Sequence, residues 1–394
     1  MVSLVDRNED VIVVGAGPAG LGCALALNAC GVEAVRVIDR DEVGASFRRW
    51  PEGMRLITPS FHSNSFGMTD LNAISPFTSP ADFLRCEHPE GPAYADYLEA
   101  VAAHYELAVE TGVLVRDVKP DDDLLTVETS AGSRRARFVI WAVGEFQYPD
   151  DGGIEGAEFC RHGSSISDWA SVPGKEVAVV GGYESGIDAA IHLTRLGRKV
   201  HVFSRGKPWL SDSPDPSRSL SPFTLDRLRN LDRSAMERLF FHPDFSVCRV
   251  SQSEGAWALS GADGRRAILS DPPILCTGYR DGLGPVAEHF SDGKGGFRFS
   301  EEADEAPHTP GLYYSGPQLR HREALFCFIY KFRARFGIVA RDIAGKLGLS
   351  WQEPLEPWYR AGFMVEDLSC CTDCQCAFES EVDDPVPTQT GRFS

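Results

Sequence analysis

The stretch Val11-Ile-Val-Val-Gly15-Ala-Gly-Pro-Ala-Gly20 decides the fold of this chain. Its four β-branched residues are typical of a buried parallel strand, and the glycines that follow match the pattern Gly-x-Gly-x-x-Gly. Residues 21–30 are rich in Ala and Leu and predict a helix that ends at Gly31. A second strand over 35–38 leads to Asp39, nineteen residues after Gly20. This order predicts a dinucleotide-binding domain in which Asp39 accepts a hydrogen bond from a ribose hydroxyl.

Each glycine of this first fingerprint has a separate mechanical role. Gly15 makes the tight turn, Gly17 lets the backbone approach a pyrophosphate, and Gly20 lets the helix pack on the sheet. The N-terminus of the helix then faces the anion. We expect Pro18 and Ala19, which complete the turn, to contact the dinucleotide as well.

The pattern returns at Glu176-Val-Ala-Val-Val180, which is followed by Gly181-Gly-Tyr-Glu-Ser-Gly186 and by a helix predicted over 187–196. The next strand, 200–203, leads to Arg205 instead of an acid. Because a guanidinium suits a 2′-phosphate, this second site favours NADPH over NADH. The residues predicted to bind the coenzyme here are Gly181, Gly182, Ser185, Gly186 and Arg205.

The second fingerprint departs from the pattern at its middle glycine, where this chain has Tyr183. Its side chain must either turn away from the pyrophosphate or hold the pyrophosphate off. The alternative is a degenerate fold that no longer binds a nucleotide.

Two further apolar strands end in glycine turns, at Gly144 and Gly278, and a third, 311–316, precedes a helical stretch from about Glu323 to Leu347. The sequence therefore predicts an α/β fold with two nested Rossmann-like domains. The expected order is a first domain in two halves, 1–150 and 286–348, an inserted domain at 151–285, and an acidic, Cys-rich tail at 349–394. Within the inserted domain, residues 206–247 are expected to form a helical insertion that caps the site or mediates self-association.

The two fingerprints, the turns at Gly144 and Gly278, and the final Tyr-Ser-Gly316 resemble the two-dinucleotide-binding flavoproteins, which include thioredoxin reductases and flavin-containing monooxygenases. The resemblance implies FAD at the first site and NADPH in the inserted domain. The superfamily closes its FAD site with a Gly-Asp motif, whereas this chain has Gly316-Pro317, so FAD is expected to lie against the backbone there. The further residues expected to contact cofactor are Arg40, Ser46, Trp50, Val115, Gly144, Gly316 and Pro317.

The segments 47–59 and 94–107 resemble the flavin monooxygenase branch, in which a strand after Trp50 leads into a loop across the flavin. This likeness implies that O2 adds to the reduced flavin and that the flavin-bound peroxide oxygenates a nitrogen, a sulfur or a ketone of a small molecule. Asn64 is the candidate donor to the peroxide, with Asn72 nearby, although a polar loop residue more often caps a turn. The linker motif typical of this branch is shortened before His162.

A thiol-based alternative remains open. The segment 54–60 also resembles bacillithiol disulfide reductase-like proteins, which carry a Cys inside the first fingerprint where this chain has Ala19. The tail instead contains Cys370-Cys371-Thr-Asp-Cys374-Gln-Cys376, in which Cys371 and Cys374 form a Cys-x-x-Cys pair. These thiols are candidates for a redox relay or, loosely, for a soft metal, and the remaining alternative is an idle tail. A non-catalytic redox or metal sensor is a third hypothesis.

The composition limits the class of partner. Lys and Arg number 39 against 57 Asp and Glu, and the net charge of -18 repels nucleic acid and anionic membrane surfaces. The charged N-terminal residues do not resemble a signal peptide, and the eleven Cys are not spaced as a disulfide framework. We therefore expect a cytoplasmic FAD-dependent and NADPH-oxidising enzyme, most simply a monooxygenase, that binds a small molecule and O2 but no nucleic acid or membrane. Homo-oligomer formation is left open.

Overall fold

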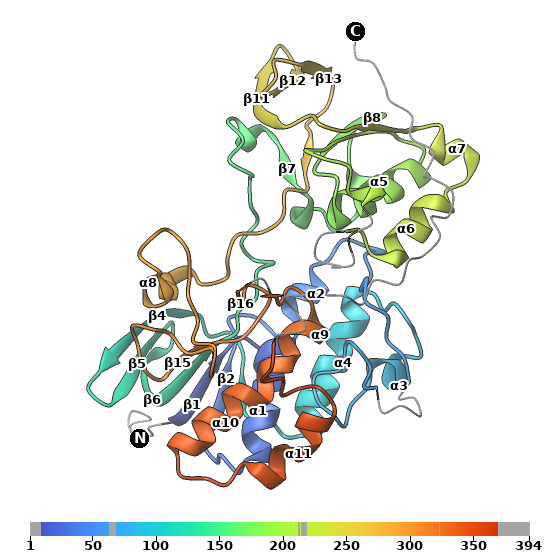
Figure 1. Ribbon diagram of the computed structural model, residues 1–394. Helices are drawn as coiled ribbons and strands as arrows, with labels where there is room; N and C mark the ends of the chain where they lie inside the picture. Colours follow the sequence, from blue (N-terminus) through green and yellow to red (C-terminus); the bar gives the residue numbers. More distant parts are fainter. Residues whose placement is uncertain (1–8, 63–67, 212, 214–218, 323, 369–394) are drawn as a thin grey trace. The chain divides into compact units, whose positions relative to one another are not determined.

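The computed structural model describes residues 9–62, 68–211, 213, 219–322 and 324–368 (Figure 1). The chain divides into two compact units. The first unit comprises the residues up to 48, residues 58–147 and the residues from 281 to the end of the described chain, and the second comprises 49–57 and 148–280. No helix in the described part of the chain is long and apolar enough to cross a membrane.

The first unit is built on a seven-stranded sheet. Its parallel part contains β1 (Glu9–Val14) between β2 (Val35–Ile38) and β6 (Gly132–Trp141), with β3 (Val109–Glu110) beside β2 and β15 (Leu312–Tyr314) beside β6. β4 (Val115–Asp121) and β5 (Leu124–Thr129) extend the first half of β6 as an antiparallel meander. All five parallel strands point the same way, so their carboxyl ends share one edge of the sheet.

Two helices cross closely in the first unit, α1 (Pro18–Ala29) and α10 (Phe336–Lys346), because Gly22 leaves room for the ring of Phe336. The other helices of this unit are α2 (Ala45–Arg48), α3 (Pro80–Leu84), α4 (Gly91–His104), α8 (Ala287–Phe290), α9 (Ile329–Phe332) and α11 (Gln352–Arg360). Short 3-10 turns occur at η5 (Gly284–Val286) and η6 (Arg333–Arg335).

The predicted continuous helix from Glu323 to Leu347 is wrong in its first part. The chain after β15 forms a short hairpin of β16 (Arg320–His321) and β17 (Ala324–Leu325), which turns at Arg322 with a φ of 53°. Helical structure begins only at Ile329. The hairpin turn, with one residue in the left-handed region, prevents an earlier helix start.

The second unit contains a parallel sheet in the order β10-β9-β8-β14-β7. Its strands are β7 (Arg161–His162), β8 (Glu176–Val180), β9 (Lys199–Phe203), β10 (Leu239–His242) and β14 (Ile274–Leu275). The helices are α5 (Glu184–Arg195), α6 (Pro222–Arg229) and α7 (Arg233–Met236), and the 3-10 turns are η1 (Ala157–Phe159), η2 (Gly163–Ser165), η3 (Trp169–Ser171) and η4 (Pro208–Leu210). A separate antiparallel sheet contains β11 (Val247–Ser253), β12 (Ala256–Gly261) and β13 (Arg266–Leu269).

Two segments differ from the sequence-based expectation. Residues 206–247 are not wholly helical, because β10 pairs in parallel with β9 and extends the sheet. Residues 49–57 form no strand and pack within the second unit. There the Glu52 N–H donates to the carbonyl of Ser167 at 2.7 Å, and a Cβ added at Gly53 would lie 2.6 Å from His192 Cε1.

The same backbone contact fixes the glycine turn in both units. A Cβ at Gly20 would lie 1.9 Å from the carbonyl oxygen of Gly15, and a Cβ at Gly186 would lie 1.9 Å from that of Gly181. Gly15 and Gly181 also have φ values of +112° and +116°, in the region that favours glycine. Only glycine therefore lets each helix begin this close to its strand.

Replacing Gly20 with Ala is expected to destabilise the first unit by about 2–3 kcal/mol or more, because the new methyl group would overlap backbone atoms that cannot move aside. The matched control is Gly345→Ala, at an exposed helical position where an added Cβ meets nothing within 4 Å. The control should be neutral or slightly stabilising. Thermal unfolding followed by circular dichroism measures both, and equal unfolding temperatures for the two variants would contradict the packing argument.

Candidate functional site

The predicted residues of the first site gather at the carboxyl edge of the first sheet. The fingerprint follows β1, Asp39 and Arg40 follow β2, Gly144 follows β6, and Gly316 and Pro317 follow β15. Ser46 lies in α2, and Val115 begins β4 just after Val113, whose N–H donates to the carbonyl of Asp39 at 2.9 Å. Such an edge of parallel strands is where open α/β sheets bind ligands.

Asp39 is placed directly against the fingerprint turn. One carboxylate oxygen accepts a hydrogen bond from Ala16 N at 2.7 Å and the other from Asp41 N at 2.8 Å. Burial raises the pKa of Asp39, and the two backbone hydrogen bonds oppose this shift. Each oxygen keeps a lone pair with which the carboxylate can accept a bond from a ribose hydroxyl.

The N-terminus of α1 has room for an anion. A Cβ added at Gly17 would meet nothing within 4 Å, and no side chain caps the helix. The N–H groups of the first helical turn therefore remain available for a phosphate. Pro18, Ala19 and Gly20, which form this turn, are buried.

The second unit repeats this arrangement at the end of β8. Gly181 makes the turn, Gly186 packs α5 on the sheet, and Ser185 lies in the first turn of α5. A Cβ at Gly182 would lie 2.6 Å from Ser204 Oγ, so a larger residue here would have to displace the side chain of Ser204. Arg205 is exposed just beyond β9, and within the described residues its guanidinium makes no recorded ion pair.

The side chain of Tyr183 reaches a distant segment of the second unit. Its hydroxyl donates to the carbonyl oxygen of Ser219 at 2.7 Å. Whether this side chain leaves room for a pyrophosphate stays a prediction.

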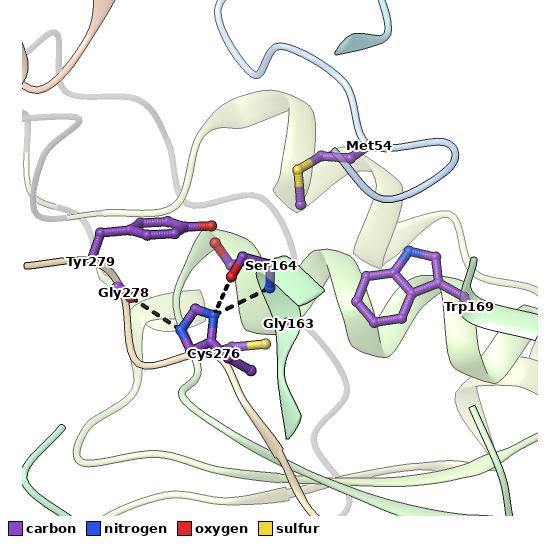
Figure 2. A pocket seen from close by; sticks show the side chains of 9 residues that line it. Met54, Gly163, Ser164, Trp169, Cys276, Gly278 and Tyr279 are labelled. Carbon is purple, nitrogen blue, oxygen red and sulfur yellow. Dashed lines mark hydrogen bonds between the residues drawn. The ribbon is translucent and has the colours of Figure 1, made fainter. Parts of the chain in front are cut away.

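A small pocket lies beside the second fingerprint (Figure 2). The residues that line it include Met54, His162, Ser164, Trp169, Ser185 and Tyr279. His162 Nδ1 accepts a bond from Ser164 N, so Nε2 carries the proton and donates to the carbonyl of Gly278 at 3.1 Å. Burial lowers the pKa of His162 and so favours its neutral form. Of these side chains, only that of Ser185 was predicted to bind the coenzyme, although His162 ends β7 at the carboxyl edge and Gly278 follows β14.

The buried thiols are poor nucleophiles. Burial raises the pKa values of Cys23 and Cys276 to about 12, so both stay protonated near neutral pH. The pKa values of Cys30 and Cys160 are also raised to about 12 by burial. The candidate relay residues Cys371 and Cys374 lie outside the described residues.

The predicted peroxide donor, Asn64, also lies outside the described residues. Its neighbour Asn72 is buried and structural, because its amide nitrogen donates to the carbonyl of Thr58 at 2.8 Å and to Ser60 Oγ at 2.9 Å. Trp50 lies in the 49–57 segment of the second unit, and its contact with a cofactor stays a prediction.

In each unit a parallel strand, a glycine turn and a helix follow one another, as in proteins that bind two dinucleotides. Residues 12–316 match the pyridine nucleotide-disulphide oxidoreductase family, and the chain belongs to that family. The predicted α/β class with Rossmann-like domains and the predicted superfamily are confirmed.

Three known proteins illustrate the relationship. Bacilliredoxin reductase Bdr of Bacillus subtilis is 25% identical over 341 residues, which are 85% of this chain and 98% of the relative. The structure of bacillithiol disulfide reductase Bdr (YpdA) from Staphylococcus aureus has a TM-score of 0.70 at 21% identity and covers 86% of this chain and 99% of its own. A flavin-containing monooxygenase from Stenotrophomonas maltophilia has a TM-score of 0.66 at 20% identity and covers 87% of this chain and 100% of its own.

The chain is accordingly an FAD-dependent oxidoreductase that uses a pyridine nucleotide. The residues at the first edge fit FAD, since Gly17 leaves the space and Asp39 supplies the acceptor. We propose that the second edge holds NADPH, with Arg205 at the 2′-phosphate and α5 at the pyrophosphate.

Replacing Gly17 with Val should yield a folded protein with little FAD, because the side chain would occupy open space and block only the pyrophosphate. The absorbance ratio at 450 and 280 nm gives the flavin content of the purified protein. Gly20→Ala, in contrast, should lose stability and flavin together. Full flavin content in Gly17→Val would contradict the assignment of this turn to FAD.

Replacing Arg205 with Ala should raise the KM for NADPH about 10- to 100-fold, since a charge-assisted hydrogen bond is worth about 1.5–3 kcal/mol. The KM for NADH should change little. Steady-state oxidation of the two coenzymes measures this difference, and Arg266→Ala, at another exposed position of the second unit, is the control. Equal losses for both coenzymes would argue against a phosphate contact at Arg205.

Proposed function

We propose that this protein is an NADPH-dependent thiol/disulfide oxidoreductase whose acceptor is a disulfide. The observation that carries the proposal is the match with bacilliredoxin reductase, which runs along 98% of that relative. The family to which the chain belongs supports the same chemistry. This reverses the preference for a monooxygenase that the sequence motifs alone suggested.

The proposed reaction transfers two electrons from NADPH to a disulfide. One NADPH and one proton reduce one disulfide: the S–S bond breaks, and two thiols and NADP+ form. When bound, FAD accepts hydride from NADPH and supplies the two electrons to the disulfide.

The residues of the chain contribute binding and orientation. Asp39 and the N-terminus of α1 would hold the ribose and pyrophosphate of FAD, while Arg205 would select the phosphorylated coenzyme. In the second unit, Ser164 and Ser185 line the same small pocket, and His162 holds Ser164 by accepting a hydrogen bond from its backbone N–H. The hydroxyl of Ser164 can hydrogen-bond a polar part of the coenzyme.

The relay thiols are proposed to be Cys371 and Cys374. The resemblance to bacillithiol disulfide reductase-like proteins implies a Cys at the position of Ala19, which is buried at the start of α1. The thiol nearest to it along the chain, Cys23, is fully buried with a raised pKa and is not suited to attack a disulfide. The tail supplies a Cys-x-x-Cys pair of the kind that exchanges with disulfides.

A flavin monooxygenase is the second candidate, and Ala19 is the observation that favours it, since no thiol is needed between flavin and O2. In that case Asn64 would be the donor to the flavin-bound oxygen. The cytoplasmic location stays a prediction, and homo-oligomer formation stays open.

The test is NADPH oxidation by the full chain, without O2, in the presence of cystine or bacillithiol disulfide. We expect turnover that depends on the disulfide and that falls at least tenfold in the double variant Cys371→Ser with Cys374→Ser. Reduction of the flavin by NADPH should survive in the same variant, since it needs no thiol.

The matched control is Cys248→Ser, because Cys248 is an exposed single thiol of the second unit. It should retain full activity. NADPH turnover that requires O2 and is unchanged in the double variant would contradict the proposal and favour the monooxygenase.

A further inference from the structure

Tyr183 has the same place in the second fingerprint that Gly17 has in the first. Each residue directly precedes the helix of its fingerprint, and each is extended, with φ and ψ of -90° and -173° at Gly17 and -98° and -165° at Tyr183. Because the two backbones match, the Cα–Cβ bond of Tyr183 has the direction that a Cβ would have at Gly17.

That direction points into the space in front of the helix N-terminus. At Gly17 a Cβ would meet nothing within 4 Å. A pyrophosphate reaches the N–H groups of the first helical turn through this space. The side chain of Tyr183 therefore starts in the path of the anion and has to be held to one side.

A hydrogen bond ties the tyrosine to a distant segment of the chain. Its hydroxyl donates to the carbonyl oxygen of Ser219 at 2.7 Å, and its ring packs against the apolar core beneath α5. The bond reaches 36 residues along the chain, beyond the end of β9. It links the fingerprint to the segment that leads into α6.

The next fingerprint residue, Glu184, holds the residues that follow the acceptor Ser219. Glu184 accepts hydrogen bonds from Ser221 N and, at 2.5 Å, from Thr224 Oγ1, while Ser221 caps α6. Both Ser221 and Thr224 are buried. Tyr183, at the position of the middle glycine, and Glu184, at a variable position, thus both bind the segment that leads into α6.

We infer that Tyr183 is a positioning residue for the coenzyme: its hydroxyl bond to Ser219 keeps the ring out of the pyrophosphate path. The inference rests on the proposed assignment of NADPH to the second fingerprint. According to this inference, coenzyme binding needs the tyrosine hydroxyl only because the tyrosine ring would otherwise block the pyrophosphate. A glycine at position 183 has no ring, so coenzyme binding should then not depend on the bond to Ser219.

The experiment compares Tyr183→Phe and Tyr183→Gly in the full, FAD-loaded protein, with dissociation constants measured by titration calorimetry. In Tyr183→Phe the ring loses its anchor and samples the blocking orientation, so the dissociation constant for NADP+ should rise about three- to tenfold. In Tyr183→Gly it should return to the wild-type value or below. Tyr359→Phe, at an exposed position, is the control for the loss of a hydroxyl group.

Adenosine 2′-phosphate separates positioning from general damage to the site. This probe keeps the 2′-phosphate but has no pyrophosphate, so its dissociation constant should be unchanged in Tyr183→Phe. Weaker binding of both probes, no change for NADP+, or failure of Tyr183→Gly to restore binding would each overturn the inference.

Failure of the underlying assignment gives a different result. If NADPH does not bind at the second fingerprint, Arg205→Ala will leave the binding of adenosine 2′-phosphate unchanged in the wild-type background. If Arg205→Ala weakens that binding while Tyr183→Phe leaves NADP+ unaffected, the assignment stands and only the role of Tyr183 is wrong.

Discussion

The close approach of backbone to backbone at the two glycine turns is the constraint on which both dinucleotide sites depend. Gly20 and Gly186 each lie against the carbonyl of the first glycine of their turn, and Gly15 and Gly181 lie against the chain at the end of a neighbouring strand, at Ala142 and Cys276. No side chain fits in these contacts. The contact places the N-terminus of α1 and that of α5 at the carboxyl edge of its sheet, where Asp39 and Arg205 then follow from the neighbouring strands.

The sequence predicted the parts of the fold that are encoded locally. The β-branched run at 176–180 and the strand at 35–38 have the predicted bounds, because buried parallel strands followed by glycine turns have a strong local pattern. The strand β10 was missed inside a segment read as helical, since its place is set by pairing with β9. The hairpin of β16 and β17 was also missed, because a pair of two-residue strands leaves almost no periodic pattern.

The candidate site also has parts that the sequence predicts and parts that depend on the folded structure. The position of Asp39 beside the first turn was predictable from spacing, and the structure adds its two hydrogen bonds with Ala16 and Asp41. The partner of Tyr183 was not predictable, since Ser219 lies on a distant segment and offers only its backbone carbonyl. Nor does composition distinguish a buried thiol such as Cys23 from a reactive one, because the raised pKa comes from burial in the folded core. The motifs favoured a monooxygenase, whereas the similarity along most of the chain is to bacilliredoxin reductase, so the choice between the two chemistries depends on more than motifs shared across a superfamily.

Within the described residues, the second unit consists of two separate chain segments, so it cannot be exchanged by replacing one continuous stretch of the chain. A transplant of residues 148–280 alone would leave behind the turn around Gly53, which packs on His192 and donates to the carbonyl of Ser167 through Glu52. The graft would expose these surfaces and would lack Met54 at its pocket. An exchange of this unit between related proteins therefore has to include both segments, 49–57 and 148–280. Changes in the nine-residue loop and in the domain almost a hundred residues further along the chain are thus coupled.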